Sequence, residues 1–371
     1  MHILLLPNSL KGSLSARQTA RILQRTLHKH KIKSFPLSDG GDGFIDFFTA
    51  LYPRATLVSC TAQNAFGISK RTSYLWLSNQ KTAVIETARV CGLGTAKKEE
   101  LDPLGASSFG VGQVMLHALN KGAKTIYIGL GGVACSDGGA GMAAALGTRF
   151  LDARGKRLPL GTKPLLKLAA LDIKTLSARL RDVTVYAVAD VINPMLGPHG
   201  SARIFGPQKG ATPAQVHQIE KALAQYARVV QKTTGKNIAH TPSTAAAGAL
   251  CAGLYGLCGA DIILGADFLR AHLPLEKWGK WADLIISSEG KLDTQTLFGK
   301  APLAALQTAA AHRKPALFIC GQYDPRATKK LPKNLQLSIA CLADFAPSAQ
   351  ESIDRAAYYL GRLGEILNEW Y

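Results

Sequence analysis

Five polar segments of this chain combine residue types that can bind or transfer an anionic group. Each lies at the end of a candidate strand, where the ligands of open α/β sheets bind. Lysines can neutralise phosphate there, and paired carboxylates can accept a proton or bind Mg²⁺. Ordinary turns and helix caps are the alternative at each position. The segments are 7–13, 38–43, 129–141, 189–210 and 288–300.

Segment 129–141 is the best candidate for a phosphate cradle. It holds six glycines in thirteen residues, follows an apolar run and leads into a helical pattern. Such a loop lets backbone N–H groups converge on an anion. It is not the GxGxxG fingerprint of dinucleotide sites, so no dinucleotide is expected. A tight packing turn is the weaker interpretation.

Two segments near the N-terminus also carry candidate ligands. Lys11 could contact a phosphate beside a helix N-terminus, although its loop lacks Walker spacing. Asp39 and Asp42 are separated by Gly40 and Gly41, which permit close backbone approach. This pair could bind Mg²⁺ or accept a proton. A capped turn and an Asx turn are the respective alternatives.

The last two segments carry a candidate base and a candidate metal site. Asp190 directly follows an apolar run, and Lys209 lies further along the same segment as a candidate phosphate contact. Glu289 and Asp293 flank Lys291, an arrangement that suits Mg²⁺ and nucleotide phosphates. A capping aspartate and an exposed charged loop are the alternatives.

The elements that position these segments follow the rhythm of βα units. Short apolar runs lead into helical patterns, which predicts a mainly parallel sheet covered on both faces. Segment 55–86 alternates instead and predicts antiparallel strands or a hairpin. The βα rhythm at both chain ends suggests one domain interrupted by another, with expected bounds of 1–75 plus 278–371, and 76–277. The apolar runs are 3–6, 125–129, 183–188, 283–287 and 316–320.

Composition narrows the class of protein. The 371 residues are 47% hydrophobic and 19% charged, which excludes a disordered or coiled-coil chain. The formal net charge of +19 calls for an acidic partner, such as nucleic acid, an anionic membrane or a phosphorylated small molecule. The uncharged stretch 243–260 is rich in small residues and predicts a close-packed helix rather than a membrane span. Seven scattered cysteines without paired spacing predict neither zinc nor disulfides, and fit a cytoplasmic protein.

Taken in order, these segments resemble the type 1 glycerate kinases, and the likeness runs through nearly the whole chain. One such motif would be weak, whereas four in register are specific. The motifs are SDGGDG at 38–43, GLGG at 129–132 with SDGGAGMAAALG at 136–147, DVINP at 190–194 with FGPQKGA at 205–211, and SEGKLDTQT at 288–296 with GKAP at 299–302.

The resemblance implies an enzyme that phosphorylates D-glycerate with ATP and Mg²⁺ and forms 2-phosphoglycerate. It implies two α/β domains, one Rossmann-like or flavodoxin-like with a parallel sheet and interrupted by a second, mixed α/β domain, with the site in the cleft between them. It favours small-molecule partners, D-glycerate and ATP, over a membrane or nucleic acid. The sequence does not define an oligomeric state.

The same resemblance, with the chemistry of the side chains, implies roles for individual residues. Asp190, Lys11 and Lys209 are the expected catalytic groups, and Glu289 and Asp293 the expected Mg²⁺ ligands. The expected contacts to substrate and phosphate are Ser9, Asp39, Gly40, Gly41, Asp42, Gly131, Gly132, Asp137, Gly138, Gly139, Asn193, Lys291 and Lys300.

The sequence departs from the family pattern at several of these loops. Segment 244–250 has fewer glycines than the family pattern. Two other functions therefore stay open: a kinase for another small hydroxy acid, and a kinase-fold protein that binds nucleic acid or another polyanion without glycerate kinase activity. The remaining departures are Asn8 for an aspartate, Gly12 for an acid, Val133 and Ser136 in the glycine-rich loop, and Ser287, Ser288 and Lys291 where Thr, Gly and Arg are usual.

Overall fold

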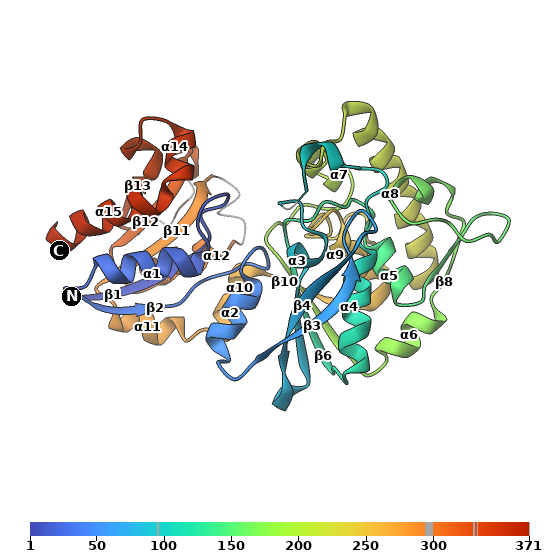
Figure 1. The fold of residues 1–371 in the computed structure, drawn as a ribbon, viewed down its shortest axis with the longest axis horizontal. Coiled ribbons are helices and arrows are strands. Elements are labelled where there is room, and N and C mark those ends of the chain that lie inside the picture. The colour runs from blue at the N-terminus through green and yellow to red at the C-terminus, as the bar shows by residue number, and fades with distance from the viewer. Residues whose placement is uncertain (95, 294–299, 329–330, 332, 371) are drawn as a thin grey trace. The chain divides into compact units, whose positions relative to one another are not determined.

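The computed structural model describes residues 1–94, 96–293, 300–328, 331 and 333–370. The chain forms two compact α/β units (Figure 1). Unit 1 comprises Met1–Leu51 and Leu264–Tyr371, and unit 2 comprises Tyr52–Ile263. The chain thus leaves unit 1, builds unit 2 and returns. Both boundaries lie earlier in the sequence than the expected bounds at 75/76 and 277/278.

Unit 1 is built on a five-stranded parallel sheet with strand order β13-β12-β11-β1-β2. Strand β1 pairs with β11 although they come from opposite ends of the chain, with Ile3 opposite Leu284 and Leu6 opposite Ser287. The residues from Ile3 to Leu6 are fully buried, as expected for a strand covered on both faces. The strands are β1 (His2–Pro7), β2 (Lys31–Ser34), β11 (Leu284–Leu292), β12 (Ala316–Tyr323) and β13 (Leu337–Cys341).

The strand order of unit 1 reverses between β1 and β11. From β1 the chain proceeds to β2 on one side, whereas β11 is followed by β12 and β13 on the other side. The loops after these two neighbouring strands therefore lead in opposite directions. Such a topological switch point is the usual position of the ligand crevice in an open α/β sheet.

Helices cover this sheet, and α1 (Ala16–Thr26) shows how the sequence specifies them. Ser15 caps its N-terminus and forms a capping box with Gln18. Ala20 and Leu23 are buried on one face, while Arg17 and the other arginines of the helix are exposed. The further helices of unit 1 are α2 (Phe44–Leu51), α10 (Gly265–His272), α11 (Leu275–Trp281), α12 (Ala301–Ala311), α13 (Pro325–Thr328), η6 (Leu342–Phe345), α14 (Ala349–Asp354) and α15 (Ala356–Trp370).

Unit 2 contains a mixed six-stranded sheet with strand order β10-β9-β6-β5-β4-β3. Strands β5, β6 and β9 are parallel, while β3 and β4 form an antiparallel hairpin that continues into β5. The hairpin predicted at 55–86 is therefore present, and its pairing with β5 places it in unit 2. The strands are β3 (Thr56–Gln63), β4 (Ser69–Leu77), β5 (Thr82–Glu86), β6 (Thr125–Leu130), β9 (Thr184–Ala189) and β10 (Asp261–Leu264), with β7 (Arg149–Leu151) and β8 (Ala170–Asp172) as a separate pair.

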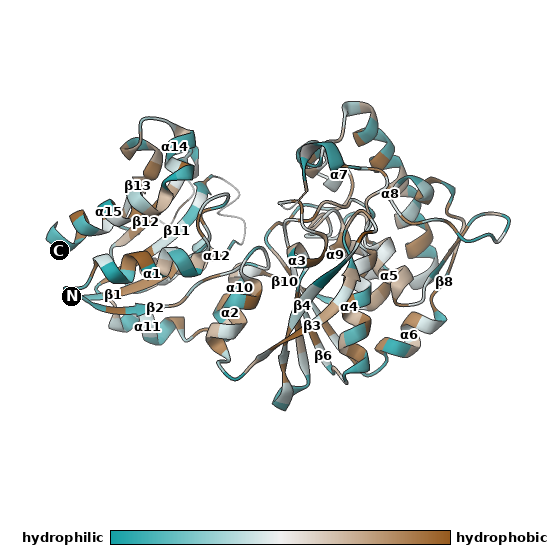
Figure 2. Cartoon of the chain, viewed as in Figure 1, coloured by the Kyte–Doolittle hydropathy of each residue, from teal (hydrophilic) through white to brown (hydrophobic). Residues whose placement is uncertain are grey.

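The helices of unit 2 pack their apolar faces around this sheet. The long helix α8 shows hydrophilic and hydrophobic stretches side by side in Figure 2, and it buries residues such as Ile219, Leu223 and Tyr226. The predicted helix in 243–260 is shorter than the stretch, because the helix begins only at Leu250. No described helix is long and apolar enough to cross a membrane. The described helices are η1 (Ser78–Gln80), α3 (Thr87–Cys91), η2 (Lys98–Glu100), α4 (Phe109–Asn120), α5 (Ala140–Ala145), η3 (Lys163–Lys167), α6 (Lys174–Leu180), α7 (Ser201–Phe205), η4 (Pro207–Lys209), α8 (Pro213–Thr234) and α9 (Leu250–Cys258).

Candidate active site

The switch point of unit 1 brings two of the predicted segments into direct contact. The amide of Asn8 donates to the carbonyl of Ser288 (3.1 Å), and the hydroxyl of Ser288 donates to the carbonyl of Asn8 (2.8 Å). A Cβ at Gly290 would lie 2.7 Å from the amide nitrogen of Lys11, so this close approach requires glycine. The loop after β1 thus lies directly on the end of β11.

A cavity of about 260 Å³ opens beside this contact. Lys11, Lys291 and Lys300 line it together with Glu289. The amine of Lys300 lies 2.6 Å from Oε1 of Glu289, and both side chains are mostly buried. The remaining lysines bring positive charge to a crevice at the carboxyl ends of parallel strands, which suits an anionic ligand.

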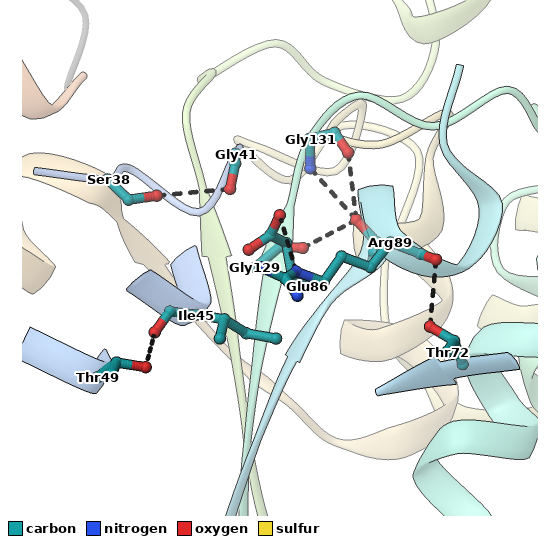
Figure 3. Close-up of polar contacts among 10 residues, drawn as sticks. Ser38, Gly41, Ile45, Thr49, Thr72, Glu86, Arg89, Gly129 and Gly131 are labelled. Carbon is teal, nitrogen blue, oxygen red and sulfur yellow. Dashed lines mark hydrogen bonds and ion pairs between the residues drawn. The ribbon is translucent and has the colours of Figure 1, made fainter. Parts of the chain in front are cut away.

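The side chain of Asp39 contacts the N-terminus of α12 in the same unit. Its Oδ2 accepts hydrogen bonds from the backbone amide of Ala301 (3.3 Å) and from Nδ2 of Asn8 (3.4 Å). A carboxylate at a helix N-terminus is favoured by the helix dipole. Ser38 donates to the carbonyl of Gly41 and closes the adjacent turn (Figure 3). Asn8 can donate to Asp39, whereas the aspartate usual in the family would place a second carboxylate beside it.

The parallel strands of unit 2 bring a second group of residues to one edge. Glu86 pairs in register with Gly129, and Leu130 pairs with Ala189 directly before Asp190. The ends of β5, β6 and β9 thus align a carboxylate, the start of the glycine-rich loop and a second carboxylate. Asp190 is half-buried there.

Glu86, which the sequence analysis did not select, is a buried carboxylate at this edge. Nε of Arg89 lies 3.6 Å from its Oε1, and the carbonyl of Arg89 accepts a hydrogen bond from Thr72 (Figure 3). Thr87 donates to the carbonyl of Gly129 (2.8 Å) and anchors α3 to the end of β6. An acid at the end of a strand was the available signal, but the sequence analysis assigned segment 55–86 to antiparallel strands or a hairpin, whereas β5 pairs with β6 in parallel.

Asp137 holds the glycine-rich loop in its conformation. Its fully buried carboxylate accepts hydrogen bonds from Ser107 Oγ, from both the amide and hydroxyl of Ser108, and from the amides of Gly139 and Gly141. Gly139 has a φ of 78°, a value that favours glycine. The acceptor positions of Asp137 are thus used within the protein, which gives it a positioning role.

Lys209 is buried beneath the same loop. Its amine donates to the carbonyl of Cys135 at 2.6 Å, and a Cβ at Gly248 would lie 2.6 Å from the amine. Burial lowers the pKa of Lys209 below its usual value. In this structure Lys209 joins the glycine-rich loop to segment 243–249, whereas the sequence predicted a contact to phosphate.

Segment 243–249 takes up a conformation that normally favours glycine. Ala247 and Ala249 have φ values of 54° and 64°, in the left-handed region. The segment is held by the loop after β9, because the amide of Ala245 donates to the carbonyl of Asn193 (3.0 Å) and the amide of Ser243 donates to that of Ile192 (3.1 Å). Alanine thus stands where the backbone geometry would suit glycine.

The predicted residues divide between the two units. Within unit 1 these are Ser9, Lys11, Asp39, Gly40, Gly41, Asp42, Glu289, Lys291, Asp293 and Lys300, and within unit 2 they are Gly131, Gly132, Asp137, Gly138, Gly139, Asp190, Asn193 and Lys209. Asn193 donates to the carbonyl of His199 and so shapes its own loop. Part of the SEGKLDTQT and GKAP motifs, 294–299, lies outside the described residues.

The assignment of Glu289 and Asp293 as Mg²⁺ ligands stays a prediction. Among the described residues no group of three or more His, Cys, Asp or Glu could hold a metal. Phosphotransferases bind Mg²⁺ through one or two carboxylates plus the phosphates of the substrate, so a full protein cage is not required. Glu289 lines the cavity and is paired with Lys300, and Asp293 directly follows β11, so two carboxylates of the kind that binds this ion lie near the end of this strand.

Fold and site together define an α/β enzyme of the small-molecule kinase class, with anion-binding loops at the carboxyl ends of parallel strands. A family model described as "Glycerate kinase family" matches residues 3–371. The chain belongs to the glycerate kinase family.

Individual relatives cover most of the chain. A glycerate kinase of Halalkalibacterium halodurans is 34% identical over 86% of this chain and 85% of its own length. A glycerate 2-kinase of Escherichia coli K12 is 35% identical with the same coverage. A crystal structure from Salmonella typhimurium LT2, of a protein suggested to be glycerate kinase 2, matches with a TM-score of 0.79 and 30% identity, over 100% of this chain and 98% of that one.

Proposed function

We propose that this protein transfers the γ-phosphoryl group of ATP to D-glycerate and forms 2-phosphoglycerate. The observation that carries the proposal is the crevice of unit 1, where Lys11, Lys291 and Lys300 line one cavity with Glu289. Lys300 is paired with Glu289, and Lys11 and Lys291 add positive charge that suits a polyanion such as a nucleoside triphosphate. Membership of the glycerate kinase family supports glycerate as the acceptor.

Phosphoryl transfer requires positioning and charge neutralisation rather than covalent chemistry from the protein. Lys11, Lys291 and Lys300 neutralise charge on the phosphates. Asp190, at the end of β9, orients the attacking hydroxyl and accepts its proton. Glu289 and Asp293 would hold Mg²⁺, which would further neutralise the charge of the phosphates.

The glycine-rich loop provides backbone amides, and buried contacts hold those amides in place. Asp137 and Lys209 fix this loop from beneath, through the amides of Gly139 and Gly141 and the carbonyl of Cys135. We assign both residues to positioning, because their polar atoms contact protein groups. The seven free cysteines are all buried, which supports our proposal of a cytoplasmic location.

The experiment is ³¹P and ¹H NMR of the purified protein with ATP, Mg²⁺ and D-glycerate. Loss of the γ-phosphate signal and appearance of 2-phosphoglycerate are expected. Formation of 3-phosphoglycerate would contradict the proposed position of transfer, and no product from folded protein would contradict the kinase function. The same measurement with other hydroxy acids tests glycerate as the acceptor.

Replacement of the proposed base tests the assigned chemistry. Asp190→Asn removes proton acceptance while it keeps the size of the side chain, so kcat is expected to fall by about 10²–10⁴-fold. A kcat within a few-fold of wild type would remove Asp190 from the catalytic role. Circular dichroism of both proteins establishes that the variant is folded.

A further inference from the structure

The lining of the cavity at the switch point of unit 1 combines two chemically different kinds of side chain. Lys11, Lys291 and Lys300 are the basic residues of this lining. Within the described residues, Lys11 has no carboxylate at salt-bridge distance, and its side chain is exposed. A cation that the protein leaves unpaired at a strand end is available to an anionic ligand.

The lining also includes apolar side chains. These are Leu10 from the loop after β1, Leu342 of η6, and Ala349, Ile353 and Ala356 of α14 and α15. Leu10, Leu342 and Ala356 are nearly fully buried, whereas Ile353 remains 36% exposed. This large aliphatic side chain at the cavity therefore still has surface that a ligand can cover.

Two glycines also contribute to the lining of the cavity. Gly290 of β11 and Gly321 of β12 both line it, and a Cβ at Gly321 would lie 2.8 Å from the carbonyl oxygen of Gly290. The two glycines let neighbouring strand ends lie close together and add no side chain to the lining. Aliphatic side chains beside bare backbone suit a planar, apolar ring system.

From these features we propose that this cavity is the nucleotide site, with the nucleobase against Leu342, Ile353 and Ala356 and the phosphates toward the lysines. The choice of a nucleotide rests on the proposed kinase function. Glycerate is a three-carbon acid without an apolar body, so it would leave the apolar side chains of the lining without a contact. A cavity of about 260 Å³ is smaller than typical drug-sized sites, so it holds the nucleoside part while the phosphates extend along the lysines.

The test separates the base from the phosphates by means of two ligands. According to the proposal, ADP contacts both the apolar side chains and the lysines, whereas inorganic tripolyphosphate contacts only the lysines. Ile353→Ser is expected to weaken ADP about tenfold and to leave tripolyphosphate unchanged, because it removes apolar contact alone. Lys11→Met is expected to weaken both ligands, by about 5- to 20-fold. Isothermal titration calorimetry of the full chain measures all four affinities.

A matched control checks the general effect of such a substitution. Ile68 is an isoleucine of unit 2 that is 64% exposed and lies outside this cavity, so Ile68→Ser should bind ADP like wild type. Thermal unfolding of each variant shows that it is folded. Wild-type affinity for ADP in Ile353→Ser, or equal weakening of tripolyphosphate in that variant, would overturn the proposal, as would failure of the wild type to bind ADP.

The outcome is distinguishable from that of the kinase function itself. If the wild type turns over glycerate but Ile353→Ser binds ADP normally, the kinase function stands and the nucleotide site is wrong. If the variants show the expected pattern but no acid is phosphorylated, the nucleotide site stands and the proposed acceptor is wrong.

Discussion

Replacement of Asp137 by asparagine separates a positioning role from direct contact with phosphate. Oδ2 accepts hydrogen bonds from Ser107, Ser108 and Gly141, while Oδ1 accepts from the amide of Gly139 (3.2 Å). An asparagine that keeps its oxygen at the position of Oδ2 places its NH₂ group at the position of Oδ1. This NH₂ group then faces the amide of Gly139, so that two buried donors oppose each other.

The expected cost follows from these contacts. A buried donor left without a partner costs about 1–3 kcal/mol, and loss of the charge weakens the remaining bonds, since charge-assisted bonds are roughly twice as strong as neutral ones. We therefore expect Asp137→Asn to lower the free energy of unfolding by about 3 kcal/mol. Urea denaturation followed by circular dichroism measures this value.

The control is Asp102→Asn. Asp102 is exposed. A single oxygen of its carboxylate accepts hydrogen bonds from the amides of Leu104 and Gly105, and an asparagine oxygen can accept both equally well. Its unfolding free energy should change by less than about 0.5 kcal/mol. A loss below about 1 kcal/mol in Asp137→Asn would refute the positioning role, and a large loss of activity at unchanged stability would favour direct contact with phosphate.

Three further predictions concern stability. Ala247→Gly and Ala249→Gly should each raise the free energy of unfolding, measured by urea denaturation, by up to about 1 kcal/mol. Glycine relieves left-handed strain of about 1–2 kcal/mol, and its larger loss of backbone entropy on folding offsets only part of this gain. Unchanged or lower stability would contradict this prediction. Burial lowers the pKa of Lys209 in the folded state below its usual value of 10.5. Between these two pKa values the unfolded chain binds more protons than the folded chain. The contribution of Lys209 to the free energy of unfolding therefore rises with pH in this range. The free energy of unfolding of wild type, relative to that of Lys209→Met, should therefore increase toward high pH in denaturation experiments. The same pH dependence in both proteins would contradict this prediction. Asn8→Asp should lower the free energy of unfolding by about 1 kcal/mol at neutral pH and by less at acid pH, because the new carboxylate would face that of Asp39. A variant as stable as wild type at both pH values would contradict this prediction.

The sequence predicted the architecture well because continuous apolar runs and their polar ends are local features. The run Ile3–Leu6 predicted a buried strand of a parallel sheet, and the structure confirms it. The alternating segment 55–86 predicted a hairpin, which is also present. The switch point could not be derived in this way, because the neighbourhood of β1 and β11 depends on residues from opposite ends of the chain.

The candidate site was predictable by segment but not by atom. The sequence pattern indicated that Lys209 and Asp137 lie in polar loops. Only the packing of these loops shows that both side chains contact protein groups. Glu86 escaped selection because the apolar run before it fits a hairpin strand as well as a parallel strand. The direction of a side chain is set by tertiary contacts, which residue types and spacing do not contain.

The most direct test of the proposed function is the initial rate of ADP formation by the purified chain with ATP and Mg²⁺, with and without D-glycerate. The proposal predicts ADP formation that depends on D-glycerate and equals the phosphoglycerate formed, one for one. ADP formation that is indifferent to D-glycerate, or none from protein shown to be folded, would contradict it.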